Sequence, residues 1–168
     1  MQEISLGQAS KFTSPNPLTV ICTETSIGKT NLAPVSWWSY LSFKHNIICF
    51  AMAKTSYSGE MVRINKQVVL AMPGVSIADE IMACGGISGR DIDKAAELAI
   101  ELIDLPEGAI KVPAHSRIAI QCRLMNTVDA GDHWLYLCTV DHVYAISTEE
   151  ALFAWNGYAK LRPAKMSD

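Results

Sequence analysis

The clearest pattern in the chain is a strict alternation of apolar and polar positions over residues 117–124. Ile118, Ile120, Cys122 and Leu124 fall on one face, and the positions between them are mostly polar. Successive side chains of a β-strand point to opposite faces, so this alternation is typical of a strand with one buried face. The segment therefore predicts a half-buried strand.

Four other apolar, β-branched or aromatic runs also predict strands, because turn residues bound them. They are Leu18–Thr23, Ile47–Ala53, Gln67–Met72 and His133–Ile146. In the last and longest run, the polar pair Asp141-His142 interrupts the pattern. We expect that strand to bend there.

Helical spacing occurs in fewer places. Ser56–Ile64 and Ser76–Cys84 predict short helices, and Gly85-Gly86 is expected to cap the second one. Asp93–Ile103 has the best helical pattern, and Pro106 follows it. Many short strands with a few inserted helices predict a mainly β fold, a closed or nearly closed antiparallel barrel. Periodicity by itself does not distinguish such a barrel from a sandwich.

The composition narrows the class of protein. A chain of 168 residues predicts a single domain over 1–168. Only 18% of the residues are charged, which favours extra buried area in a subunit interface or around a large ligand. The net charge of -3 and the lack of any basic run exclude the pattern of a nucleic-acid binder. No signal-peptide pattern and no apolar run of about 20 residues appear, which predicts a cytoplasmic protein without a membrane partner.

The five cysteines do not form a recognisable motif. Their number is odd, and no two of them have the C-x-x-C spacing. We expect reduced, buried side chains, with a redox pair or a metal site as the less favoured alternatives. No metal is therefore expected. The cysteines are Cys22, Cys49, Cys84, Cys122 and Cys138.

A polar and aromatic segment, Asn31–Trp38, is the first candidate for binding chemistry. It combines short hydrogen-bonding side chains with the adjacent Trp37 and Trp38. A planar ligand with hydrogen-bonding edges would use both kinds of group. The alternative is a strand whose tryptophans fill the core.

A second candidate, Lys54–Ser58, directly follows a predicted strand and begins a predicted helix. One cation, four hydroxyls and the free N–H groups of a helix start can hold a phosphate. An ordinary helix cap with solvated hydroxyls is an equal alternative. In contrast, Gly85–Gly89 lacks the G-x-G-x-x-G spacing and follows a helical pattern, so it predicts no dinucleotide site.

A third region contains Ser88–Lys94 and, further on, Gly131-Asp132-His133. Separately, these pieces read as a loop, a helix cap and a turn. In sequence order with the two earlier segments, they resemble the flavin reductase-like family of FMN-binding split-barrel proteins, and within it the flavoredoxins. The resemblance runs from about Pro15 to Tyr158. Its four motifs are Asn31-x-Ala33-x-x-Ser36, Lys54-Thr55-Ser56-Tyr57, Ser88–Lys94 and Gly131–His133.

The resemblance implies a six-stranded antiparallel Greek-key barrel and a homodimer with non-covalent FMN near the subunit interface. It also implies the residues around the cofactor. The segment that would hold the ring and ribityl chain contains Asn31, Ala33, Ser36 and Trp37. The phosphate would be held by Lys54, Thr55, Ser56, Tyr57 and Ser58. Two further residues, Lys94 and His133, would lie close to the flavin. An aromatic residue near the C-terminus, such as Tyr158, could cover the ring.

Three functions are compatible with these features. The first is an FMN-dependent oxidoreductase that takes electrons from NAD(P)H and passes them to free flavin or an acceptor protein. The second is a flavoredoxin-type electron carrier with a protein donor, and the third is a non-catalytic flavin-binding barrel. The cofactor would carry the redox chemistry, so no side-chain catalyst is required, although His133 could donate a hydrogen bond or a proton near the ring.

Overall fold

Seven antiparallel strands form the main sheet of the computed structural model, which describes residues 1–164. The order across the sheet is β3-β2-β6-β9-β10-β5-β4. The strands are β2 (Thr19–Glu24), β3 (Thr30–Val35), β4 (Trp38–Ser42), β5 (Ile47–Ala53), β6 (Gln67–Pro73), β9 (Ser116–Ala130) and β10 (His133–Ala145). All five strands predicted from the sequence are present. Four differ by at most one residue at an end, whereas β9 continues six residues beyond the predicted 117–124.

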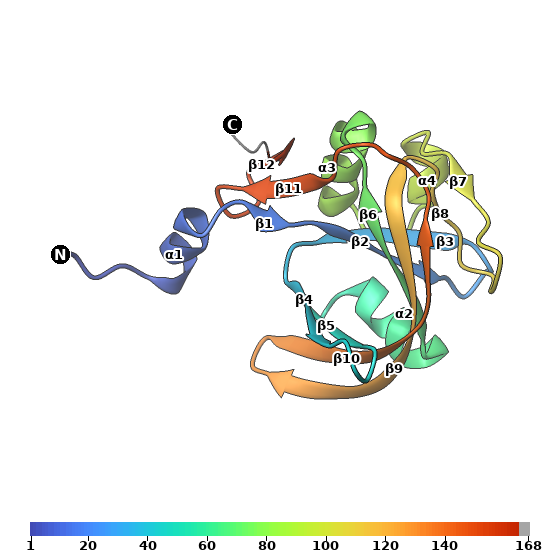
Figure 1. Cartoon of the computed structure of the whole chain (residues 1–168), viewed down its shortest axis with the longest axis horizontal. Coiled ribbons are helices and arrows are strands. Elements are labelled where there is room, and N and C mark those ends of the chain that lie inside the picture. The colour runs from blue at the N-terminus through green and yellow to red at the C-terminus, as the bar shows by residue number, and fades with distance from the viewer. Residues whose placement is uncertain (165–168) are drawn as a thin grey trace.

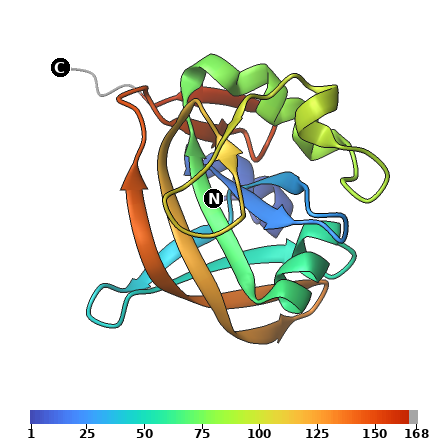
Figure 2. The same cartoon turned by 90° about the vertical axis from the view of Figure 1, so that its right-hand side faces the viewer.

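The sheet curls into a barrel that is split along one side (Figure 2). Its two edge strands, β3 and β4, follow each other in the chain and are joined only by Ser36 and Trp37. They do not pair with each other. The junction between them is bonded to β5, where the Ala51 N–H donates to the Trp37 carbonyl at 2.9 Å. The mainly β split barrel is confirmed, but the main sheet has seven strands rather than six and its ladder is not closed.

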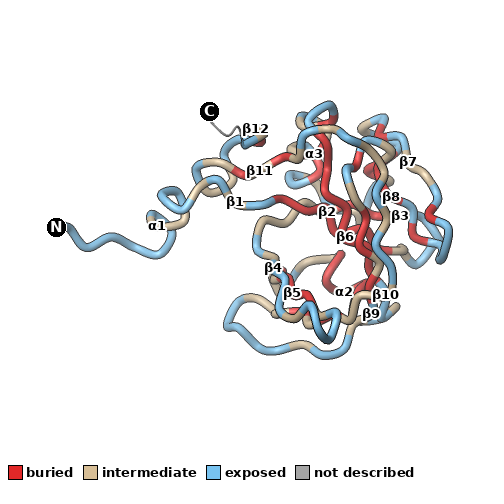
Figure 3. Tube along the Cα trace, viewed as in Figure 1, coloured by how far each residue is buried: buried red, intermediate tan, exposed pale blue. Residues whose placement is uncertain are grey.

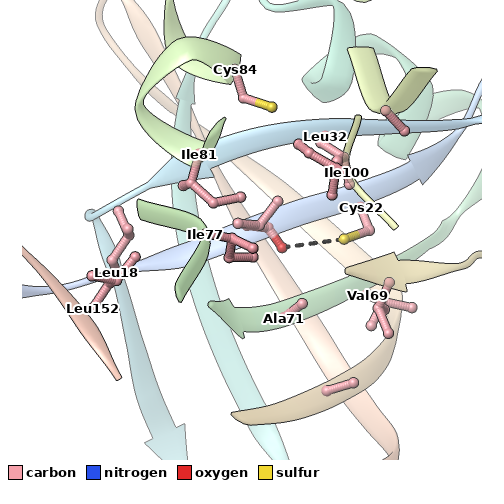
Figure 4. Packing of buried hydrophobic residues seen from close by; sticks show 14 of the residues in the cluster. Leu18, Cys22, Leu32, Val69, Ala71, Ile77, Ile81, Cys84, Ile100 and Leu152 are labelled. Atoms are coloured by element: carbon pink, nitrogen blue, oxygen red, sulfur yellow. Dashed lines mark hydrogen bonds between the residues drawn. The ribbon is translucent and has the colours of Figure 1, made fainter. Parts of the chain in front are cut away.

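Both faces of the sheet are buried, because alternate residues of its central strands enter two different clusters. Ile21 lies in the barrel interior, where Phe50 stacks on Tyr136 with ring centroids 4.8 Å apart. Val20 and Cys22 lie on the outer face, under Ile81 and its neighbours (Figure 4). Burial on both faces explains why this strand reads as an unbroken apolar run.

Smaller elements surround the barrel. The helices are α1 (Leu6–Phe12), α2 (Tyr57–Asn65), the 3₁₀ turn η1 (Val75–Ile77), α3 (Ala78–Gly86) and α4 (Lys94–Glu97). The short strands are β1 (Asn16–Pro17), β7 (Leu102–Ile103), β8 (Val112–Pro113), β11 (Leu152–Trp155) and β12 (Lys160–Pro163). α2 packs against β2 and β3, and α3 against β3 and β12. α1 has no buried residue and lies away from the body (Figures 1 and 3).

Two helix predictions are wrong in extent. The pattern over Asp93–Ile103 yields only the single turn of α4, because Ala99 takes a left-handed conformation with φ of 52° that ends the helix. Gly85-Gly86 does not cap the preceding helix. Both glycines lie within α3, and the extended Ile87 follows them.

The expected bend in the long strand is confirmed, because the β9–β10 register shifts between Val140 and His142. All five cysteines are buried and unpaired, as predicted. Within residues 1–164, no helix is long and apolar enough to cross a membrane.

Candidate functional site

A cavity of about 580 Å³ lies beside the split in the barrel. Six segments that are distant in sequence form its wall: the β3–β4 junction, the end of β5 with the start of α2, the end of α3 with the following loop, the start of α4, the start of β10 and the β11–β12 turn. The lining residues are 33–37, 51–53, 55–58 and 84–89, with Lys94, His133 and Tyr158.

The fold brings most of the predicted site residues together in this one cavity. Ala33, Ser36, Trp37, Thr55, Ser56, Tyr57, Ser58, Lys94 and His133 all line it. Asn31 and Lys54 do not. Binding by each of these residues stays a prediction, but their assembly from four of the six segments is a property of the fold.

The two adjacent tryptophans have different environments. Trp37 is 57% exposed, and its ring centroid lies 5.0 Å from that of His133 with an angle of 47° between the planes. The His133 Nδ1 lies 2.8 Å from the Asp132 carboxylate, which fixes the imidazole. Trp38 instead packs against the interior cluster. Trp38 therefore fills the core, as the alternative prediction has it, and Trp37 does not. The exposed ring of Trp37 is a flat aromatic surface at the entrance of the cavity.

The start of α2 forms part of the wall of the same cavity. Ser56 is the N-cap, and its Oγ accepts a hydrogen bond from the Gly59 N–H at 3.2 Å. The N–H groups of Tyr57 and Ser58, in the first turn, have no helical acceptor. The two interpretations of this segment are therefore compatible, because one hydroxyl caps the helix while other groups face the cavity.

The two predicted residues that lie outside the cavity have other partners. The Lys54 Nζ donates to Asp129 at 2.8 Å and lies 4.7 Å from the centroid of the Trp134 ring. The hydrogen bond from Lys54 lowers the pKa of the Asp129 carboxyl. The buried Asn31 donates from Nδ2 to the Ser58 Oγ at 2.7 Å. Lys54 is thus paired at the surface, and Asn31 lies behind the cavity wall.

Lys94 is the cation of the cavity. It is only 5% exposed, and its Nζ donates to the main-chain carbonyls of Leu32 and Cys84, both at 2.8 Å. Burial lowers the pKa of this ammonium. An ammonium has three donors, so one remains for a ligand.

Tyr158, the aromatic residue that the resemblance implies as a cover for the ring, lines the cavity. The Tyr158 Oη is buried without a hydrogen-bond partner among the described residues, and burial raises the pKa of this phenol. Sequence reasoning missed Gly85, Gly86 and Ile87, which also form part of the wall. The available signal was the position of these residues just before the Ser88–Lys94 motif.

Together these groups suit a long, partly planar ligand with an anionic end. An aromatic surface stands at the mouth, a helix N-terminus with hydroxyls lies on one wall, and an ammonium and an unpaired phenol lie on another. No cluster of three or more metal-ligating side chains occurs within the described part of the chain.

The chain is similar to known proteins over most of its length. Residues 12–162 match the family described as flavin reductase like domain. An uncharacterized protein of Archaeoglobus fulgidus is 24% identical over 129 residues, which cover 76% of this chain and 72% of that protein.

Two solved structures illustrate the likeness in fold. The FMN-binding protein from Thermus thermophilus, with bound 1-cyclohex-2-enone, superposes with a TM-score of 0.83 at 17% identity, covering 100% of this chain and 96% of that one. Flavoredoxin from Methanosarcina acetivorans gives a TM-score of 0.84 at 16% identity, covering 100% and 94%.

Proposed function

Because the chain belongs to the flavin reductase-like family, we propose that it binds FMN non-covalently and transfers electrons from NAD(P)H to free flavin or to an acceptor protein. The observation that carries this proposal is the cavity itself. It joins an exposed tryptophan, a helix N-terminus and a buried ammonium in one space of about 580 Å³. That volume lies within the range of pockets that hold small ligands and cofactors.

The phosphate of FMN fits the start of α2. Thr55, Ser56 and Ser58 present hydroxyls there, and the first-turn N–H groups of Tyr57 and Ser58 lack helical acceptors. The positive end of the helix dipole adds to the attraction for an anion. Lys54, which the resemblance also assigns to the phosphate, is paired with Asp129 in the structure, and its contact with the phosphate stays a prediction.

The ring fits the other side of the cavity. Trp37 offers it an aromatic surface, and the backbone N–H groups of Ser36 and Trp37 are donors for its pyrimidine edge. The unpaired Tyr158 hydroxyl is a buried donor that a ligand in this cavity would satisfy. Bound FMN would supply a two-electron acceptor able to take hydride from a nicotinamide and to return electrons singly or in pairs.

The protein groups would favour the reduced state by placing donors and positive charge where negative charge builds. Lys94 is held by two carbonyls, so its charge is not cancelled by a carboxylate contact and acts on the cavity. His133, oriented by Asp132, could hold a proton beside Trp37. No other side chain needs to react.

A flavoredoxin-type carrier with a protein donor is the second candidate. Its support is the similarity in fold to the Methanosarcina acetivorans flavoredoxin. A non-catalytic flavin-binding barrel is the third. The five free, buried cysteines fit the reducing cytoplasm that we propose as the location.

Two measurements test the proposal. Purified protein mixed with FMN is expected to show bound-flavin absorbance and quenched flavin fluorescence; no binding of FMN contradicts all three functions. Stopped-flow mixing of the complex with NADH and NADPH then separates the first two functions. Rapid loss of flavin absorbance supports the reductase, whereas bleaching too slow for turnover leaves the carrier as the better proposal.

A further inference from the structure

Asn31 is connected to the cavity of about 580 Å³ through another residue. It is 3% exposed in β3 and does not line the cavity. Its Nδ2 donates to the Ser58 Oγ at 2.7 Å, and Ser58 does line the cavity. The side chain of Asn31 therefore lies directly behind the proposed phosphate seat.

The backbone of Gly89 fixes the orientation of the Asn31 amide. A Cβ added to Gly89 would lie 1.9 Å from the Asn31 Oδ1, so this oxygen lies directly against the glycine. The oxygen accepts no hydrogen bond within residues 1–164. An amide oxygen against a Cα–H is weakly attractive, whereas an amide N–H in that place would face another hydrogen. Nδ2 is therefore the atom that faces Ser58.

This orientation sets the direction of the Ser58 hydroxyl. A hydroxyl has one donor, and Asn31 already uses an acceptor site of the Ser58 oxygen. Within the described chain, Ser58 donates no side-chain hydrogen bond of its own. Its O–H is thus left free to donate into the cavity, beside the first-turn N–H groups of α2.

We infer that Asn31 is a positioning residue that keeps the Ser58 hydroxyl as a donor to the phosphate group of the bound flavin nucleotide. The inference rests on the proposed function and adds to it a residue that never touches the ligand. It makes Asn31 a determinant of selectivity for FMN over riboflavin, which has the same ring and no phosphate.

Asn31→Asp reverses the hydrogen bond. A carboxylate accepts from the Ser58 O–H, so the hydroxyl would turn its proton away from the phosphate and its lone pairs toward it. We expect FMN binding to weaken by about tenfold or more and riboflavin binding to change by less than about twofold. Asn31→Ala leaves Ser58 free to rotate, so its loss is expected to be specific for FMN but smaller.

Asn126→Asp is the matched control. Asn126 is exposed on β9 and its side-chain oxygen accepts from the Thr127 N–H, a bond that aspartate retains. The variant makes the same change in net charge at a distance from the cavity. It is expected to bind both flavins as the unaltered protein does.

The experiment is calorimetric or fluorescence titration of each variant with FMN and with riboflavin, with thermal unfolding as a check on the fold. Asn31→Ala is also made in a Ser58→Ala background, where its effect on FMN is expected to disappear because no hydroxyl is left to orient. Equal weakening of both flavins, or an undiminished effect without Ser58, overturns the inference. Asn31→Ala supplies the same comparison if the aspartate variant does not fold. Failure of the unaltered protein to bind either flavin contradicts the proposed function instead.

Discussion

Two lysines near the cavity are held in opposite ways. Lys54 is bound to a carboxylate, Asp129, whereas Lys94 is bound to the uncharged carbonyls of Leu32 and Cys84. A carboxylate cancels most of the field of an ammonium, and a carbonyl does not. The buried Lys94 is therefore the residue that makes the cavity attractive to negative charge.

This difference could not be predicted from the sequence. Lys54 adjoins the hydroxyl-rich segment, so it was the natural candidate for a phosphate cation. Its partner Asp129 is 75 residues away in the chain, on another strand. Only the β5–β10 and β9–β10 pairings bring the two side chains together.

Gly89 provides a prediction about packing at a single residue. Gly89→Ala would place a methyl group 1.9 Å from the Oδ1 of the buried Asn31, which has little room to move. We expect the free energy of unfolding to fall by about 1–3 kcal/mol, as measured by urea denaturation. Gly7→Ala is the control, because no atom lies within 4 Å of a Cβ at that position in α1. Unchanged stability of the Gly89 variant would show that this contact relaxes without cost.

At the scale of elements, one carboxylate joins three segments outside the cavity wall. Glu149, in the connection between β10 and β11, accepts from the Ser76 Oγ at 2.6 Å and the Ser76 N–H at 3.2 Å. Its other oxygen lies 2.8 Å from the His115 Nδ1 in the β8–β9 turn. Gly74 provides the room that the Glu149 carboxylate occupies, because a Cβ at this position would lie 2.3 Å from the carboxylate. The hydrogen bonds from Ser76, and next the one from His115, lower the pKa of Glu149.

This junction predicts a dependence of stability on pH. A carboxyl whose pKa is lower in the folded state stabilises the fold above its ordinary value of 4.5, and the effect is lost as pH falls through the folded value. Glu149→Gln should therefore lower stability near neutral pH and reduce the loss on acidification. Urea unfolding between about pH 7 and about pH 3 measures both effects.

The neighbouring Glu150→Gln is the matched control, because Glu150 is exposed. It should keep the acid dependence of the unaltered protein. If Glu149→Gln keeps that dependence in full, other carboxyl groups cause the loss of stability in acid.

At the scale of the whole molecule, the exposed aromatic residues suggest how two copies associate. The resemblance implies a homodimer, and we propose the β4–β5 hairpin as part of its interface. Tyr40 and Leu41 are about half exposed, and Phe43 is 81% exposed. The ring centroids of Tyr40 and Phe43 lie 5.4 Å apart. Contiguous apolar side chains on a surface often mark an interface.

Phe43→Asp is therefore expected to convert a dimer to a monomer in sedimentation velocity. A charged side chain in an apolar interface loses hydration without gaining a partner. Ile27→Asp, in the β2–β3 turn, is the control, because Ile27 is a single apolar residue that is 76% exposed, and it should leave the dimer intact. A dimer that tolerates Phe43→Asp excludes the hairpin as the interface, and a monomeric unaltered protein contradicts the homodimer.

Most strands of the fold could be predicted from the sequence, because each has a recognisable order of apolar and polar residues. Alternation predicted β9, and unbroken apolar runs predicted the strands buried on both faces. The helix over Asp93–Ile103 was predicted wrongly because its apolar residues satisfy helical spacing while the left-handed Ala99 breaks the path. The position of Tyr158 depends on the β11–β12 hairpin folding back beside α3, which local sequence does not encode.

The two-residue junction between β3 and β4 has a mechanical consequence. Ser36 and Trp37 are too short to let the strands on either side separate independently, and both line the cavity. A change in the separation of β3 and β4 at this end of the sheet is therefore expected to displace the indole of Trp37. The width of the cavity entrance and the curvature of the sheet are in this way expected to change together. A ligand that holds Trp37 in place would then also make the sheet more rigid.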